Sequence, residues 1–251
     1  MALKAGISGF VYYHYWFNGR RLLERPFNDI LASGKPDFPF CLCWANEGWN
    51  RMWDGSQRSV IMPQQYSEAD DHAHIEWLAK AFADDRYIKV DGRPLLLVYR
   101  ASDLPDCRAT FARWREYAMA HGFPGLAIGV VRAFPTEFRD PGDFGADFSI
   151  DFKPNGYEYG PLVSSDDPLE IGYRLHRVWE YEALVRFGLQ DRWPKYPYCP
   201  SVCPGWDNAV RRKQGGVIFR NPTPVAFSNW LGTTMVRQAL RVRQPPYVFI
   251  N

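Results

Sequence analysis

Seven short apolar runs recur along the chain, and in most of them the apolar residues follow one another instead of alternating with polar ones. Continuous apolar runs of this length are typical of parallel strands that are covered on both faces. Segments with helical spacing separate several of the runs, and this alternation predicts an α/β fold with a parallel sheet. The predicted strands lie at residues 7–13, 38–44, 94–99, 125–131, 147–152, 198–203 and 247–250.

Four helices are predicted between these strands. Ser67 is a favourable N-cap residue and an acidic first turn follows it, so a helix is expected to run from there through residue 82. Residues 106–121 carry aromatic and apolar residues at helical spacing, and the pattern stops at Gly122. Residues 168–187 and 224–241 show a similar pattern. The apolar side chains of these helices are expected to face the core, and we assign them no chemistry.

This order of strands and helices favours a (β/α)8 TIM-type barrel, in which functional side chains gather just after the strands. A doubly wound open sheet is the alternative architecture, but no G-x-G-x-x-G or Walker pattern follows any of the runs. Seven strands are visible instead of the eight that such a barrel contains, which is a mismatch of one strand. A barrel of about 250 residues forms one domain, so a single domain over residues 1–251 is predicted.

Charge and composition narrow the classes of function. The net charge is +2 and no long basic block occurs, so no nucleic-acid partner is expected. No apolar run reaches the ~18 residues of a transmembrane segment, and residues 1–5 lack the apolar part of a leader peptide. A cytoplasmic location with reduced thiols is therefore expected. The pairs Cys41/Cys43 and Cys199/Cys203 lack the usual spacing of zinc ligands, and neither a metal nor another cofactor is predicted.

Residues 40–55 read F-C-L-C-W-A-N-E-G-W-N-R-M-W-D-G and join a strand-like run to tryptophans, carboxylates, an amide and a guanidinium. Aromatic faces pack on the C–H side of a sugar ring, while the polar groups bind its hydroxyls. The segment therefore predicts a sugar-binding platform at a barrel mouth. The alternative is a loop whose aromatics only plug that mouth. The candidate residues are Trp44, Asn46, Glu47, Trp49, Trp53 and Asp54.

Polar and aromatic residues follow the other predicted strands as well. For several of them a structural role is the alternative: His14 as a histidine packed among aromatics, Arg100 as a salt-bridge partner, Asp151 as one half of an ion pair with Lys153, and Asp207 as a helix N-cap. The substrate-binding candidates at these strand ends are His14, Tyr15, Trp16, Tyr99, Arg100, Arg132, Trp206, Asp207 and Asn208.

Hydrolysis of a glycosidic bond normally needs two carboxyl groups that flank it, ~5–9.5 Å apart. The candidate catalytic residues are Glu47 and Asp151, and Asp207 is a third visible carboxylate. A metal-dependent hydrolase that uses His14, Asp151 and Asp207 is an alternative, although no His-x-His pair follows a strand. Neither a Ser-His-Asp order nor a nucleophile elbow is evident, which leaves esterase chemistry with little support.

Several motifs resemble those of the WbsX-type family, which is similar to glycoside hydrolase family 99. The motifs are G-I-S-G-F-V-Y-Y-H-Y-W-F (6–17), L-L-E-R-P (22–26), D-F-P-F-C-L-C-W-A-N-E-G-W-N-R-M-W-D-G (37–55), D-D-R-Y-I-K-V-D-G-R-P (84–94), P-G-W-D-N-A-V-R-R (204–212) and Y-V-F-I-N (247–251). The resemblance extends over the whole chain and implies a (β/α)8 barrel. It also implies a glycosyltransferase or glycoside hydrolase-like protein that acts on bacterial cell-surface polysaccharide such as lipopolysaccharide O-antigen, with a glycan or nucleotide-sugar substrate.

The chain also departs from this family. In the family, another strand precedes the position of Gly6, and a W-N-E-W-A-E run with a glutamate pair follows the position of Asn251; such a pair carries the catalysis in family 99 hydrolases. Residues 152–155 read F-K-P-N, where the family more often has a Glu-Phe-Pro-Pro-like run. The resemblance thus implies a barrel truncated at both ends, with exposed edges that could self-associate. It further implies that Glu47 binds hydroxyls and that the chain alone is inactive; a non-catalytic sugar-binding or scaffold remnant is the alternative.

Overall fold

A computed structural model of the chain describes residues 1–50, 60–154, 159–163, 175–212, 214–241 and 245–251. The chain divides into two compact units, each of which is described by itself. Unit 1 comprises Met1–Gly48, Pro63–Arg132 and Thr136–Ser149. Unit 2 comprises Trp49–Met62, Ala133–Pro135 and Ile150–Asn251. The expectation of a single domain over the whole chain stays a prediction.

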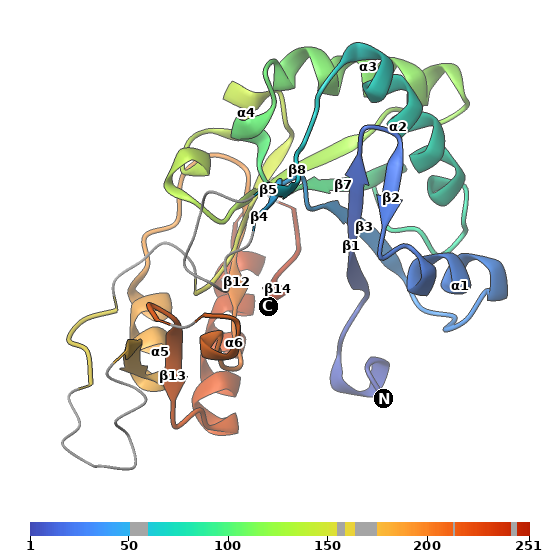
Figure 1. Cartoon of the computed structure of the whole chain (residues 1–251). Helices are drawn as coiled ribbons and strands as arrows, with labels where there is room; N and C mark the ends of the chain where they lie inside the picture. The colour runs from blue at the N-terminus through green and yellow to red at the C-terminus, as the bar shows by residue number, and fades with distance from the viewer. Residues whose placement is uncertain (51–59, 155–158, 164–174, 213, 242–244) are drawn as a thin grey trace. The chain divides into compact units, whose positions relative to one another are not determined.

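Unit 1 is built on a mostly parallel sheet (Figure 1). Its strands are β1 (Phe10–Phe17), β2 (Arg20–Leu22), β3 (Phe40–Trp44), β6 (Lys89–Val90), β7 (Arg93–Val98) and β8 (Ala127–Arg132). Parallel neighbours follow the order β8-β7-β3-β1, with Leu42 of β3 beside Leu96 of β7 and Leu96 beside Ile128 of β8. β2 pairs antiparallel with β1, and β6 pairs antiparallel with β7.

The central strands of unit 1 are buried along almost their whole length. All five residues of β3 are buried, as are five of the six residues in each of β7 and β8. A parallel strand that is covered on both faces exposes neither set of alternating side chains. The continuous apolar runs in the sequence are the direct signature of this arrangement.

The two helices that the sequence predicted in unit 1 are present, and the unit has two further helices that were not predicted, Arg25–Ser33 and Pro141–Phe144. The helices are α1 (Arg25–Ser33), α2 (Glu68–Phe82), α3 (Cys107–Ala120) and α4 (Pro141–Phe144), with short 3-10 turns η1 (Leu3–Ala5), η2 (Ala101–Asp103) and η3 (Pro135–Glu137), the last of which begins in unit 2. Ser67 Oγ accepts the Asp70 N–H at 3.1 Å and caps α2, and Asp106 Oδ1 accepts the Ala109 N–H at 3.0 Å and caps α3. These bonds satisfy backbone donors that have no partner within the helix.

Strand β9 (Phe148–Asp151) follows β8 in the strand order and carries the chain from unit 1 into unit 2. The further strands of unit 2 are β4 (Trp49–Asn50), β5 (Val60–Met62), β10 (Arg177–Glu180), β11 (Tyr198–Cys199), β12 (Ser201–Val202), β13 (Val217–Arg220) and β14 (Phe249–Ile250). β10 pairs parallel with β13, β12 pairs parallel with β14, and β4 pairs antiparallel with β5. β11 is the neighbour of β9.

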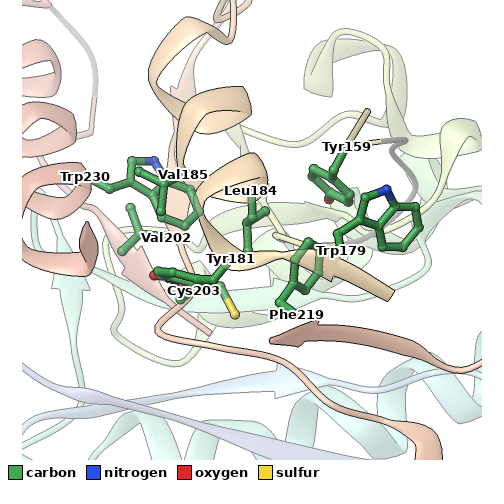
Figure 2. Close-up of a cluster of buried hydrophobic side chains, with 9 residues drawn as sticks. All are labelled: Tyr159, Trp179, Tyr181, Leu184, Val185, Val202, Cys203, Phe219 and Trp230. Atoms are coloured by element: carbon green, nitrogen blue, oxygen red, sulfur yellow. Dashed lines mark hydrogen bonds between the residues drawn. The ribbon is translucent and has the colours of Figure 1, made fainter. Parts of the chain in front are cut away.

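An aromatic core holds unit 2 together (Figure 2). It draws on helices α5 (Tyr181–Gln190) and α6 (Pro224–Ala239), the second of which matches the helix predicted at 224–241. The buried residues of the cluster are Tyr159, Trp179, Tyr181, Leu184, Val185, Val202, Cys203, Phe219 and Trp230. Where α5 meets Trp230 it carries Gly188, and a Cβ at that position would lie only 2.4 Å from the Trp230 ring. The two helices therefore approach as closely as glycine allows.

The helix predicted at 168–187 is wrong over its central part. Residues 177–180 form strand β10, in which Val178 and Trp179 are buried and pair with β13. The helix begins only at Tyr181, and residues 168–174 lie outside the described part of the chain. Pairing with a distant strand overrides the local helical pattern here.

All seven predicted strand segments contain a strand, which confirms an α/β fold with a mostly parallel sheet of about seven strands. The strands that the structure describes do not close into a barrel. Polar residues that follow β3, β7 and β8 are brought together in unit 1.

Candidate functional site: a guanidinium among carboxylates at the strand ends of unit 1

The end of β3 is tied to the end of β7 by the side chain of Asn46. Its Oδ1 accepts the Arg100 N–H at 2.8 Å, and its Nδ2 donates to the Arg100 carbonyl at 2.8 Å. The Tyr66 hydroxyl donates to the Asn46 carbonyl at 3.0 Å. Asn46 is fully buried. Its amide therefore fixes the backbone geometry of both strand ends.

Arg100 places its guanidinium among three carboxylates of unit 1. Nη1 donates to Glu47 Oε1 at 3.2 Å, Nη2 donates to Asp103 Oδ1 at 3.0 Å, and Nε lies 3.6 Å from Glu137 Oε1. We call Glu47, Arg100, Asp103 and Glu137 the Arg100 cluster. Its members come from the segments that follow β3, β7 and β8, as expected for polar groups gathered at the carboxyl ends of parallel strands.

Sequence reasoning missed two members of the cluster, Asp103, which lies three residues after Arg100, and Glu137, which is the more deeply buried of the two. The side chain of Glu137 is fully buried. It accepts hydrogen bonds from the Ser102 hydroxyl and, at 2.8 Å, from the Thr136 hydroxyl. The signal available in the sequence was weak, because Glu137 is the last residue of η3, several residues beyond β8 instead of directly at the strand end.

Glu47 and Asp103 are the accessible carboxylates of the cluster. Their side chains are 42% and 36% exposed, respectively. Burial raises the pKa of Glu47, and the nearby Arg100 guanidinium opposes this rise. Burial likewise raises the pKa of Asp103, and Arg100 partly opposes this rise. A partly exposed carboxylate with a raised pKa can accept hydrogen bonds from sugar hydroxyls or donate a proton.

Tyrosines supply the aromatic surface beside this cluster. Tyr13 is 46% exposed, and its ring lies 6.3 Å from that of Tyr99 and 6.4 Å from that of Tyr15. Burial raises the pKa of Tyr13 and of Tyr99, and the negative charge of Glu47 adds to both shifts. The sequence singled out Tyr15 and Tyr99 but not Tyr13, the most exposed of the three.

The tryptophans at the ends of β1 and β3 pack inside unit 1 instead of forming its aromatic surface. Trp16 is 5% exposed and Trp44 is 1% exposed. The Trp16 Nε1–H donates to Asp70 Oδ1 at 2.9 Å, and the Trp44 Nε1–H donates to the Trp16 carbonyl at 3.2 Å. Successive side chains of a strand point to opposite faces, so β1 turns His14 and Trp16 inward and Tyr13 and Tyr15 outward.

His14 is enclosed in an aromatic core. Its Nε2 lies 3.0 Å from His74 Nε2, and its ring stacks on Trp77 at 4.6 Å. Burial lowers the pKa of His14 to about 3 and holds the pKa of His74 well below its usual range. This is the packed-histidine alternative weighed from the sequence.

The other candidates that follow β3 in the sequence or lie at the end of β8 are not members of the Arg100 cluster. The Arg132 guanidinium at the end of β8 lies over the Phe138 ring, with Cζ 4.7 Å from its centroid. Trp49 is half-buried in β4 and belongs to unit 2. Trp53 and Asp54 lie outside the described residues.

The candidates of unit 2 make mostly structural contacts. Asp151 is 1% exposed, and its Oδ2 lies 2.5 Å from Lys153 Nζ. Asp207 Oδ1 accepts the Ala209 N–H at 2.8 Å, just before η5 (Ala209–Arg211), whose N-cap residue is Asn208 instead of Asp207. Asn208 Oδ1 accepts the Val217 N–H at 2.7 Å.

Trp206 is half-buried and packs against the aromatic core of unit 2.

Among the residues that the structure describes, no three His, Cys, Asp or Glu side chains gather so as to hold a metal ion. Nor does any helix in the described ranges have the length and apolar character needed to span a membrane. Among the described residues of unit 1, the Arg100 cluster and the neighbouring tyrosines bring carboxylates, a guanidinium and partly exposed aromatic rings to the strand ends.

Comparisons with known proteins find a matching family model and similar relatives. A family model described as "Glycosyltransferase WbsX" matches residues 1–251. Two proteins named "Uncharacterized protein WxcX", from two strains of Xanthomonas campestris pv. campestris, are each 37% identical over 252 residues. The matches cover 100% of this chain and 36% of each relative. The chain thus spans little more than a third of the length of these relatives.

Solved structures show the same fold at low sequence identity. A "Glycoside hydrolase-like protein" has a TM-score of 0.58 and 14% identity, with 100% of this chain and 72% of that chain covered. The GH99 endo-alpha-mannosidase from Bacteroides thetaiotaomicron has a TM-score of 0.57 and 12% identity, with 99% and 63% covered. With a family model that matches its whole length, the chain belongs to the WbsX glycosyltransferase family.

Proposed function

We propose that this chain supplies the sugar-binding part of a carbohydrate-active enzyme that acts on bacterial cell-surface polysaccharide, such as lipopolysaccharide O-antigen. One observation carries the proposal: the ring of partly exposed Tyr13 lies 6.3 Å from that of Tyr99, which directly precedes Arg100, and Arg100 holds the carboxylate of Glu47 in place. An aromatic face next to fixed hydrogen-bonding groups is the usual composition of a sugar site. Membership of a glycosyltransferase family supports the same substrate class.

Within this site we propose that Glu47 contacts the sugar directly. Its side chain is accessible, and its raised pKa would also suit a proton donor. Asp151 is the second catalytic candidate, but its burial and its ion pair with Lys153 favour a structural role. A location in the cytoplasm, where polysaccharide precursors would be met, belongs to the same proposal.

Binding of sugars by the purified chain tests the proposal. Saturation-transfer NMR with methyl glycosides of gluco, galacto and manno configuration should show contact with at least one of them. Glu47→Gln should weaken that binding about tenfold, as expected for loss of a hydrogen bond to a charged group worth ~1.5 kcal/mol. Tyr13→Ala should weaken it as well, through loss of the aromatic face.

Glu76→Gln is the matched control, because Glu76 is an exposed glutamate on α2 of the same unit. Its affinity for the sugar should equal that of the wild type. If no glycoside binds, or if Glu47→Gln and Tyr13→Ala bind as well as Glu76→Gln, the Arg100 cluster is not a sugar site.

A second candidate function is sugar binding without catalysis. It is favoured by the way in which Arg100 engages Glu47 and Asp103, since both accessible carboxylates already hold a fixed partner. Hydrolysis or transfer assays on glycans that bind would separate the two functions. Turnover that is lost in Glu47→Gln while sugar affinity falls only modestly would show catalysis.

A further inference from the structure

The charges of the Arg100 cluster bear on which sugars it could accept, provided that the cluster is the sugar site proposed above. All three guanidinium nitrogens of Arg100 lie close to carboxylates of the protein itself. The separations are 3.2 Å from Nη1 to Glu47, 3.0 Å from Nη2 to Asp103 and 3.6 Å from Nε to Glu137. The side chain of Arg100 is only 20% exposed. The positive charge of Arg100 is thus paired with carboxylates of the protein and holds them in position.

This arrangement differs from that of an arginine that recognises an anionic ligand. Such an arginine directs a pair of N–H groups at the ligand's carboxylate or phosphate and forms a bidentate contact. Here those N–H groups are directed at Glu47 and Asp103. An anionic ligand would have to displace a carboxylate that remains tethered nearby.

The net charge of the cluster also disfavours an anionic ligand. Three carboxylates against one guanidinium leave an excess of negative charge. Asp103 and Glu137 both act to raise the pKa of Glu47, so like charges are already within reach of one another. A further negative charge placed against Glu47 would be repelled, whereas an ammonium group would be attracted.

We propose that the Arg100 cluster selects for sugars that carry no negative charge: it binds neutral glycans, binds amino-bearing glycans more tightly, and rejects uronic acids and phosphorylated sugars. The phosphates of a nucleotide sugar are disfavoured at this position for the same reason. The glycan itself, and not a diphosphate, is the group that meets Glu47 and Tyr13.

A series of probes that differ only in charge tests this selection. Methyl glycosides, the corresponding 2-amino-2-deoxy glycosides and the corresponding uronates are compared by saturation-transfer NMR in gluco, galacto and manno configuration. In low salt the amino sugars should bind several-fold more tightly than the neutral sugars, and the uronates several-fold more weakly. Raising the salt concentration should narrow both differences, because exposed charges are screened.

Asp103→Asn provides the direct structural test, since it removes one negative charge beside Arg100 and keeps an amide oxygen that can still accept from Nη2. The ratio of uronate affinity to neutral-sugar affinity should rise several-fold in this variant. Asp85→Asn, at an exposed aspartate of unit 1, is the matched control and should leave the ratio unchanged.

The possible failures are distinguishable. If no glycoside of any charge binds, the sugar site itself is refuted. If neutral sugars bind but uronates bind equally well, sugar binding stands and charge selection is overturned. An unchanged ratio in Asp103→Asn would also overturn the selection, because the cluster would then not be its origin.

Discussion

Asn46 and Arg100 are joined by two hydrogen bonds that run in opposite directions, each 2.8 Å long. The side-chain amide of Asn46 acts on the Arg100 main chain as a neighbouring strand would, two residues beyond Trp44 and Val98, the last paired residues of β3 and β7. The bond pair fixes the backbone from which the Arg100 guanidinium extends. The position of that guanidinium among its carboxylates therefore depends on a residue that is fully buried.

Asn46→Ala is expected to destabilise unit 1. The substitution leaves the N–H and carbonyl of Arg100 without their amide partner, and each unsatisfied buried group costs ~1–3 kcal/mol. We expect the free energy of unfolding in urea to fall by roughly 2–4 kcal/mol. Asn229→Ala, at an exposed position on α6, should change it by less than about 0.5 kcal/mol. Equal effects of the two variants would refute the role assigned to Asn46.

The buried histidine pair should make the protein less stable in mild acid. The pKa of His14 is lowered to about 3 and that of His74 is lowered well below its usual range, both mainly by burial. Between about pH 6.5 and the folded-state pKa, the unfolded chain therefore binds protons that the folded chain does not. The contribution of the two histidines to the free energy of unfolding is thus fully present above about pH 6.5 and falls as the pH drops. The expected loss is up to about 1.4 kcal/mol per pH unit for each histidine.

Urea unfolding between pH 7 and pH 4.5 measures the slope of the free energy of unfolding against pH. His74→Leu should reduce the slope, because one of the two proton-binding groups is gone. His72→Gln serves as the control, since His72 is exposed on the same helix, and it should leave the slope as it is. A slope that is identical in His74→Leu and in the wild type would contradict the assignment.

Local patterns predicted much of the fold because its central strands are buried on both faces. The runs around Leu42, Leu96 and Ile128 are continuous for that reason, and the caps at Ser67 and Asp106 need only neighbouring residues. Strand β10 was missed because its pairing partner β13 is distant in sequence, so a short apolar stretch next to α5 reads as part of that helix.

The candidate site was predictable in its position but not in its details. Strand ends drew attention to Glu47 and Arg100, which the structure brings together. Which aromatic ring remains exposed depends on which face of β1 the helices cover, and nothing local in the sequence states that Trp16 is inside and Tyr13 outside. Glu137 was missed since its approach to Arg100 is a tertiary contact made by a loop residue.

The contact between α5 and α6 in unit 2 should not tolerate a side chain at Gly188. A Cβ there would lie 2.4 Å from a ring atom of Trp230, which is 1% exposed and has little room to move. Gly188→Ala should lower the free energy of unfolding by ~1–3 kcal/mol through overpacking. Gly232→Ala on α6 is the matched control, because no atom lies within 4 Å of its Cβ position.

In Gly232→Ala the only expected effect is the higher helix propensity of alanine, a gain of ~0.5–1 kcal/mol. The two glycine variants should thus shift stability in opposite directions. A loss in Gly232→Ala as large as that in Gly188→Ala would show that α6, and not the contact with Trp230, is the sensitive element.

Lys153 and Asp151 should differ in importance although they form one ion pair. Lys153 is 2% exposed and contacts two carboxylates, Asp151 Oδ2 at 2.5 Å and Asp191 Oδ2 at 3.0 Å. Lys153→Met leaves the carboxylate of Asp151 buried without its cation, which costs ~3–5 kcal/mol. Asp151→Asn should cost less, because Lys153 keeps Asp191 and the new amide can still accept a hydrogen bond.

Unfolding in urea shows which of the two variants, Lys153→Met or Asp151→Asn, loses more stability. Lys195→Met, at an exposed position of unit 2, is the control. Adding Asp151→Asn to Lys153→Met should recover part of the lost stability, since it removes the isolated charge. The same variants decide between the two interpretations of Asp151. If Asp151→Asn abolishes turnover of a bound glycan while Lys153→Met and the wild type are equally stable, the carboxylate serves catalysis and the ion pair does not hold unit 2 together.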